Sequence, residues 1–153
     1  MSFLAHAMGE PNSILDRENK KIVLRTGSYP KRGSCEWIIS GDIIQQNEVK
    51  RKGIVSEIIQ ISEISELALG LGKISGNLDI YGNRPKLWYR GLPFRGPDMF
   101  VAYEAYTYIL AQRINDSTNP IKHKVSPVLV GLKEQLDRGE LDTEALRAKG
   151  VHF

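Results

Sequence analysis

The spacing between apolar residues changes along the chain, and each spacing predicts a different kind of element. Alternation with a period of two, bounded by residues typical of turns, predicts strands at residues 20–26, 36–46 and 73–81. A turn at 82–85 precedes a further strand at 86–92, so these last two strands are expected to form a hairpin.

Between residues 54 and 71 the apolar residues recur every three or four positions, which predicts an amphipathic helix. Glutamate and glutamine side chains occupy its opposite side, and Gly70 and Gly72 are expected to end it. The predicted buried stripe consists of Ile54, Ile58, Ile61, Ile64, Leu67, Ala68 and Leu71.

Further helices are predicted towards the C-terminus. Asp98 complements the dipole of a helix that runs to about residue 114, and Pro127 opens another that ends at Gly139. Asp142 is expected to cap a short last helix. The residues predicted to be buried in the first two helices are Val101, Ala102, Ala105, Tyr108 and Ile109, then Val128, Leu129, Leu132 and Leu136.

This order of elements predicts an α+β fold, with a small, mostly antiparallel sheet, an amphipathic helix and a helical C-terminal third. Residues 1–19 have no clear period and are expected to form an N-terminal arm ahead of a single α+β domain at 20–153. The length of 153 residues, of which 41% are hydrophobic and 25% charged, fits one folded domain.

The chain contains one cysteine, Cys35, and three histidines that lie far apart in the sequence. A disulfide within the chain is therefore excluded, and neither a metal site nor a cofactor is expected. No apolar run approaches the roughly 20 residues of a membrane span, and the first residues do not resemble a secretion signal. We expect an intracellular, cytoplasmic protein and leave a nuclear location open.

No sequence motif indicates catalysis by a serine or cysteine nucleophile. Paired carboxylates need no motif, and Asp79, Asp98 and Glu104 lie near the predicted hairpin, where a shared cleft would unite them. Each also has a structural interpretation, as an outward strand residue, a helix start and a solvated helix residue. We therefore expect a protein that is not an enzyme, with a small carboxylate enzyme as an alternative.

Residues 84–95, RPKLWYRGLPFR, combine four cations with three aromatic residues. Alternate side chains of a strand share one face, so this segment would present cations and an indole together. Cations neutralise phosphates, and an indole stacks on a base or rests at a lipid surface. In the alternative, this is a solvated face with Leu87 and Tyr89 in the core. The residues predicted to bind an anionic partner are Arg84, Lys86, Trp88, Arg90 and Arg95.

Shorter basic clusters occur elsewhere, although the net charge of +3 is mild. One cluster is predicted to extend the surface for an anionic partner: Lys50, Arg51 and Lys52. Two others are Lys31 with Arg32 and Lys122 with Lys124, and only the fold decides whether all of them converge. The N-terminal arm is predicted to mediate self-association through Phe3, Leu4 and Met8.

Part of the chain, residues 37–81, resembles the core of rhabdovirus matrix proteins. The similarity lies in a strand with the sequence WIISGDIIQQ, a polar basic stretch, an amphipathic helix and a strand with the sequence ISGNLDIY. It implies a small protein that self-associates through its arm, contacts a nucleocapsid and meets a membrane with basic residues. The proline-rich late-domain motif and the strongly basic N-terminus of such proteins are absent from this sequence.

Three hypotheses follow from these patterns. The first is a non-enzymatic structural or assembly protein that forms a homo-oligomer or joins a larger complex, and contacts nucleic acid, a nucleocapsid or an anionic membrane surface. The second is a nucleic-acid-binding module that uses Trp88 and Arg90 on a sheet face. The third is the small enzyme with carboxylate chemistry.

Overall fold

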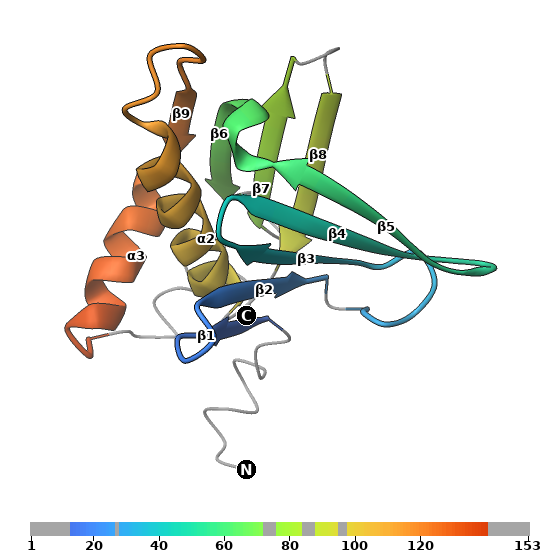
Figure 1. Cartoon of the computed structure of the whole chain (residues 1–153). Coiled ribbons are helices and arrows are strands. Elements are labelled where there is room, and N and C mark those ends of the chain that lie inside the picture. Colours follow the sequence, from blue (N-terminus) through green and yellow to red (C-terminus); the bar gives the residue numbers. More distant parts are fainter. Residues whose placement is uncertain (1–12, 27, 72–75, 84–87, 95–97, 141–153) are drawn as a thin grey trace.

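Antiparallel strands that follow one another along the chain build the first half of the fold (Figure 1). The computed structural model describes residues 13–26, 28–71, 76–83, 88–94 and 98–140. Sheet A contains, in spatial order, β1 (Ile14–Asp16), β2 (Lys21–Arg25), β3 (Cys35–Ser40), β4 (Ile43–Lys50) and β5 (Gly53–Gln60).

Sheet A has one strongly apolar face, because the strand register aligns large side chains in rows. Ile22, Ile39 and Ile44 lie opposite one another on successive strands and are buried. Trp37 is 0% exposed, and its Nε1–H donates to Oε1 of Gln46 at 3.0 Å. The indole therefore adds a large apolar area to the core while its polar N–H keeps a partner.

The chain leaves sheet A through a 3₁₀ turn, η1 (Ile61–Glu63), and enters a second sheet directly. Sheet B has the spatial order β8-β7-β6-β9. β7 pairs antiparallel with both of its neighbours, whereas β9 runs parallel to β6. The strands are β6 (Ile64–Leu71), β7 (Gly76–Gly82), β8 (Trp88–Phe94) and β9 (Lys122–Val125).

Two helices of the described residues lie together on one side of the molecule, to the left in Figure 1. α2 (Asp98–Arg113) packs on β2, η1 and β6, and α3 (Pro127–Asp137) packs on β6. The carboxylate of Asp98 is buried and accepts a hydrogen bond from the backbone N–H of Ser13 at 2.7 Å. The side chains of α2 that enter the core are Met99, Ala102, Ala105, Tyr106 and Ile109.

A buried arginine holds the corner where the chain passes from sheet A to sheet B. Arg113, 2% exposed, donates from Nε to the carbonyl of Ile64 at 3.1 Å, and its guanidinium also binds Asp116 and the carbonyl of Asn119. Asn119 in turn donates from Nδ2 to the carbonyl of Ser62 at 2.8 Å. The end of α2 thus satisfies backbone carbonyls at the point where strand pairing stops.

Several predicted elements are confirmed. The fold contains helices and mostly antiparallel strands, as the α+β class requires, but the strands form sheets of five and four strands where one small sheet was expected. The strand predicted at 20–26 is β2, and the predicted hairpin is β7 paired with β8. The helices predicted from Asp98 and from Pro127 are α2 and α3.

The helix predicted at 54–71 is wrong, because β5, η1 and β6 occupy this segment. The matrix-protein pattern therefore lacks its helical element here. Isoleucine is β-branched and suits a strand, and the chain changes sheets within the segment, which breaks the period of two. Ile54 and Ile58, predicted to be buried, are 59% and 52% exposed, whereas Ile59 is 5% exposed.

Smaller predictions also differ from the structure. The strand predicted at 36–46 is divided into β3 and β4, because Gly41 turns the chain with a φ of 58°. Part of the predicted 1–19 arm is β1, an edge strand of sheet A. The C-terminal third is not wholly helical, since β9 precedes α3. Val128 and Leu136 of α3, predicted to be buried, are exposed. The last predicted helix lies outside the described residues.

Two adjacent isoleucines test the strand assignment of β5. Ile59→Ala is expected to lower the free energy of unfolding by about 2–5 kcal/mol, because it opens a cavity in the core. Ile58→Ala is expected to cost less than about 1 kcal/mol, because its side chain is half exposed. Urea unfolding at low micromolar concentration measures both. A larger loss for Ile58→Ala would contradict the strand and support the predicted helix.

Candidate interaction surface

Five basic residues gather at one end of sheet A, where the β4–β5 hairpin projects from the body (Figure 1). The loop before β3 lies beside this hairpin, since Gly33 N–H donates to the carbonyl of Val49 at 2.8 Å, and Val49 N–H donates to the carbonyl of Ser34 at 3.0 Å. We call this cluster the basic end; it consists of Lys31, Arg32, Lys50, Arg51 and Lys52.

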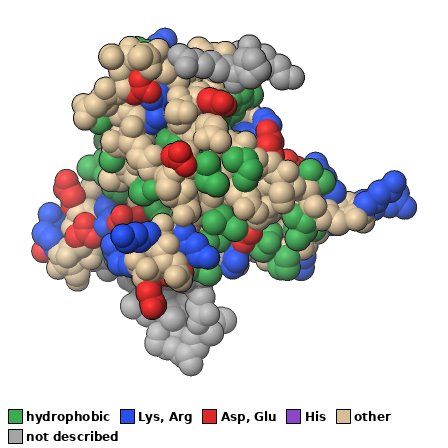
Figure 2. Space-filling model, in the orientation of Figure 1, with side chains coloured by type: hydrophobic (Ala, Val, Ile, Leu, Met, Phe, Trp, Pro, Cys, Tyr) green, Lys and Arg blue, Asp and Glu red, His purple; other side chains and the backbone are tan. Residues whose placement is uncertain are grey.

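The charges of the basic end are mostly uncompensated. Lys50 is paired, with its Nζ 2.8 Å from Oε2 of Glu48. The other four side chains are exposed and have no ion-pair partner among the described residues. Figure 2 shows Lys and Arg side chains at the far end of the projecting hairpin. A phosphate-bearing partner can therefore meet these cations without first breaking ion pairs.

Beside the basic end, β5 exposes large apolar side chains at the edge of sheet A. Ile54, Val55 and Ile58 are 59%, 57% and 52% exposed. Val49 uses its N–H and C=O on the side away from β5. Because these groups alternate along an antiparallel strand, those of Ile54, Ser56 and Ile58 point away from β4. We call Ile54, Ser56 and Ile58, with their outward backbone groups, the β5 edge.

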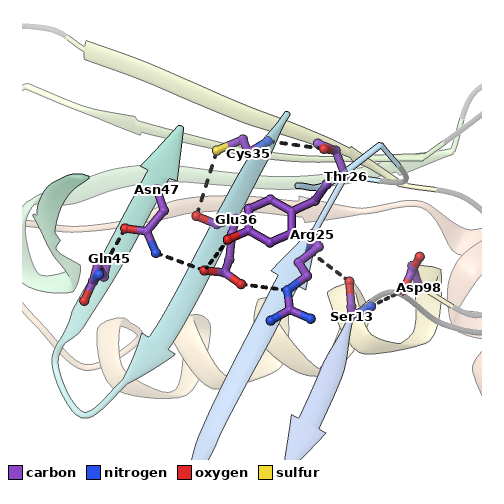
Figure 3. A network of polar contacts seen from close by, with 9 residues as sticks. Ser13, Arg25, Thr26, Cys35, Glu36, Gln45, Asn47 and Asp98 are labelled. Atoms are coloured by element: carbon purple, nitrogen blue, oxygen red, sulfur yellow. Dashed lines mark hydrogen bonds and ion pairs between the residues drawn. The ribbon is translucent and has the colours of Figure 1, made fainter. Parts of the chain in front are cut away.

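A row of polar side chains crosses the outer face of sheet A (Figure 3), and Ser56 continues it to β5. The carboxylate of Glu36 is 2.6 Å from Nε of Arg25 and accepts from Nδ2 of Asn47 at 2.9 Å. Oδ1 of Asn47 accepts from Oγ of Ser56 at 2.7 Å. Burial, followed by the nearby charge of Glu36, raises the pKa of Tyr29, whose hydroxyl also donates to this carboxylate.

The predicted basic hairpin at 84–95 is only partly described. Arg90 lies on β8, and its Nη2 donates to both carboxylate oxygens of Glu57 on β5 at 2.9 Å. Trp88 covers Gly82, since a Cβ at Gly82 would lie 2.2 Å from the indole. Arg90 therefore links the two sheets, and one face of the Trp88 ring is occupied. The remaining predicted residues, Arg84, Lys86 and Arg95, lie outside the described residues.

The alternative interpretation of this hairpin placed Tyr89 in the core, and the structure contradicts it. It is 51% exposed, and its hydroxyl donates to Oδ1 of Asp79 at 2.8 Å. This hydrogen bond, with burial as a smaller cause, raises the pKa of Tyr89 to about 12. Phe3, Leu4 and Met8, predicted to mediate self-association, lie outside the described residues.

The three carboxylates of the enzyme hypothesis have separate surroundings. Asp79 binds Tyr89 and lines a cavity of about 450 Å³ beside β9. Glu104 lies 3.5 Å from Nζ of Lys133 and lines a different cleft of about 720 Å³, between α2 and the turns of sheet A. Asp98 binds the backbone of Ser13. Neither of these two cavities is lined by more than one of the three carboxylates.

Comparisons with known proteins do not assign this surface to a family. No protein-family model matches the chain, and no curated protein or solved structure is significantly similar to it. Among the described residues, no group of three or more histidine, cysteine or acidic side chains is placed to hold a metal ion. None of the described helices is long and apolar enough to cross a membrane.

The sequence predicted the basic cluster at 50–52 but not the hairpin that carries it or its proximity to Lys31 and Arg32. The missed signal is a short turn, Arg51-Lys52 followed by Gly53, between two segments rich in β-branched and polar residues, which is typical of a hairpin. Lys31 and Arg32 lie close to this turn because β3 pairs with β4, and no local sequence pattern predicts that pairing.

The thiol of Cys35 provides a pH-dependent test of the packing beneath the hairpin. Burial, with the charge of Glu48 as the next cause, raises the pKa of Cys35 to about 11. Alkylation by iodoacetamide at pH 8 is expected to be slower than for a free cysteine by roughly two orders of magnitude, because thiolate is scarce. The rate should still rise between pH 9 and pH 10, where a free cysteine levels off. The chain in urea is the control, and an equal rate in the folded protein would contradict this packing.

Proposed function

We propose that this chain is a non-enzymatic structural or assembly protein that contacts an anionic partner through the basic end of sheet A. The observation that carries the proposal is the convergence of two clusters, Lys31 with Arg32 and Lys50 to Lys52, on one projecting end of the fold. The apolar β5 edge beside them is a second surface with no described covering, as an assembly protein requires.

The composition of the basic end favours recognition of charge over recognition of shape. Its exposed cations stand on two turns at one end of sheet A. Such a surface suits a partner with regularly spaced phosphates, either a nucleic-acid backbone or the head groups of an anionic membrane. The resemblance of residues 37–81 to matrix proteins favours the same kind of role, although its helical element is absent.

A nucleic-acid-binding module is the second candidate, and it uses the same cations. The sequence-based hypothesis of such a module used Trp88 for stacking on a base, with Arg90 beside it. Arg90 is paired with Glu57, and one face of the Trp88 ring lies on Gly82. These two residues therefore have less charge and less aromatic surface available for a nucleic acid than the hairpin pattern predicted. Single-stranded RNA and anionic vesicles, tested in parallel, show which phosphate-bearing partner these cations bind.

Removing two cations from the basic end tests the proposal. Arg51→Ala with Lys52→Ala is expected to weaken binding to single-stranded RNA or to phosphatidylserine vesicles about ten- to thirtyfold. With RNA, the slope of log affinity against log salt should fall by about 1.4, for two lost phosphate contacts. Fluorescence anisotropy and vesicle sedimentation measure the two partners.

The matched control removes two exposed cations from another part of the surface, with Lys122→Ala and Lys124→Ala on β9. This variant has the same net charge and should bind almost as well as the parent. Binding of vesicles alone would favour a membrane-surface role, and binding of RNA alone would favour the nucleic-acid module. An equal loss in both variants, or no binding to either partner, would contradict a role for the basic end.

A further inference from the structure

We propose that a second copy of this chain pairs with the β5 edge, so that sheet A continues across a two-fold axis. β5 is the terminal strand of sheet A, and its only described strand partner is β4. Ile54, Ser56 and Ile58 each direct one N–H and one C=O outward, so an added antiparallel strand can form about six backbone hydrogen bonds. Native proteins usually protect such an edge with charge, proline or a covering element.

The sequence of β5 complements itself in one antiparallel register. With Ser56 on the two-fold axis, Ile54 lies opposite Ile58 of the partner strand, and Ile58 opposite Ile54. Apolar pairs of this kind stabilise neighbouring strands, and both side chains are about half exposed in a single copy. Glu57 then lies opposite Val55. A register centred on Glu57 would place two carboxylates together, which disfavours it.

The polar row on the outer face is continuous with this register. It runs from Arg25 through Glu36 and Asn47 to Ser56, where it reaches the free edge. In the pair, Ser56 meets Ser56 of the second copy, and the row continues into the other sheet. The bond from Ser56 to Asn47 also fixes the serine rotamer, so pairing orders few additional side chains.

Charges at the two ends of β5 are of opposite sign, which suits an antiparallel pair. The turn at Arg51 and Lys52 carries uncompensated positive charge at one end. Asp42 and Glu63 flank the other end and have no ion-pair partner among the described residues. The two-fold register places the basic turn of each copy beside the acidic end of the other.

This inference names a partner for the assembly role and rests on the proposed function only in that sense. Lys31 and Arg32 lie beside β4, on the side away from the paired edge, so both remain exposed in the dimer. The test measures self-association without RNA or vesicles, so failure of pairing and failure of anionic binding give separate results.

Sedimentation equilibrium of the full chain between 10 and 500 μM tests the pairing. The parent is expected to show a monomer–dimer equilibrium that weakens at high salt, because the interface is small and its ends are charged. Ser56→Pro should remain monomeric, since proline removes an outward N–H while the ladder with β4 stays intact. Ser56→Ala is the matched control: it loses the bond to Asn47, keeps the N–H and should dimerise within about threefold of the parent.

If Ser56→Pro does not fold, Ile54→Lys with Ile58→Lys replaces it, because edge lysines prevent strand addition. Disulfide cross-linking in a Cys35→Ala background then fixes the register. Ser56→Cys should cross-link two copies, and Ile54→Cys should do so only when combined with Ile58→Cys. A parent that is monomeric at 500 μM, a Ser56→Pro variant that dimerises like the parent, or strong cross-linking by Ile54→Cys alone would overturn the proposal.

Discussion

The buried guanidinium of Arg113 is the interaction on which the arrangement of the two sheets depends. It binds the carbonyls of Ile64 and Asn119, and Asn119 holds the carbonyl of Ser62. Without the guanidinium, the carbonyls of Ile64 and Asn119 would be buried and unpaired, at a cost of about 1–3 kcal/mol each. Arg113 at the end of α2 therefore supplies the hydrogen-bond donors that let the chain pass from β5 in sheet A to β6 in sheet B.

The corner also explains why β5 is exposed. Ile59, Ile61 and Ile64 anchor the chain in the core on both sides of the turn. Between Ile59 and the turn at Arg51, sheet B reaches β5 through Arg90, which binds Glu57. The exposed apolar side chains of this part of β5, Ile54, Val55 and Ile58, have no described covering. Burial of the corner and exposure of the edge are consequences of the same geometry.

Local patterns predicted the elements whose period agrees with their surroundings. On β7, the buried Leu78 and Ile80 alternate with the exposed Asn77 and the half-buried Asp79, and α2 has a clear start at Asp98. The segment from β5 to β6 could not be predicted in this way, because a strand that changes sheets loses its period of two and imitates a helix. The basic end depends on pairing between β3 and β4, which only the folded chain establishes.

Amide hydrogen exchange of β5, followed by NMR, is the most direct test of a free strand edge that a second copy covers. In dilute protein, the amides of Val55 and Glu57 should exchange slowly and those of Ile54, Ser56 and Ile58 quickly, because only the former face β4. At several hundred micromolar, the quick amides should become slow. Uniform protection of these residues in dilute protein, or quick exchange that does not change with concentration, would contradict the account.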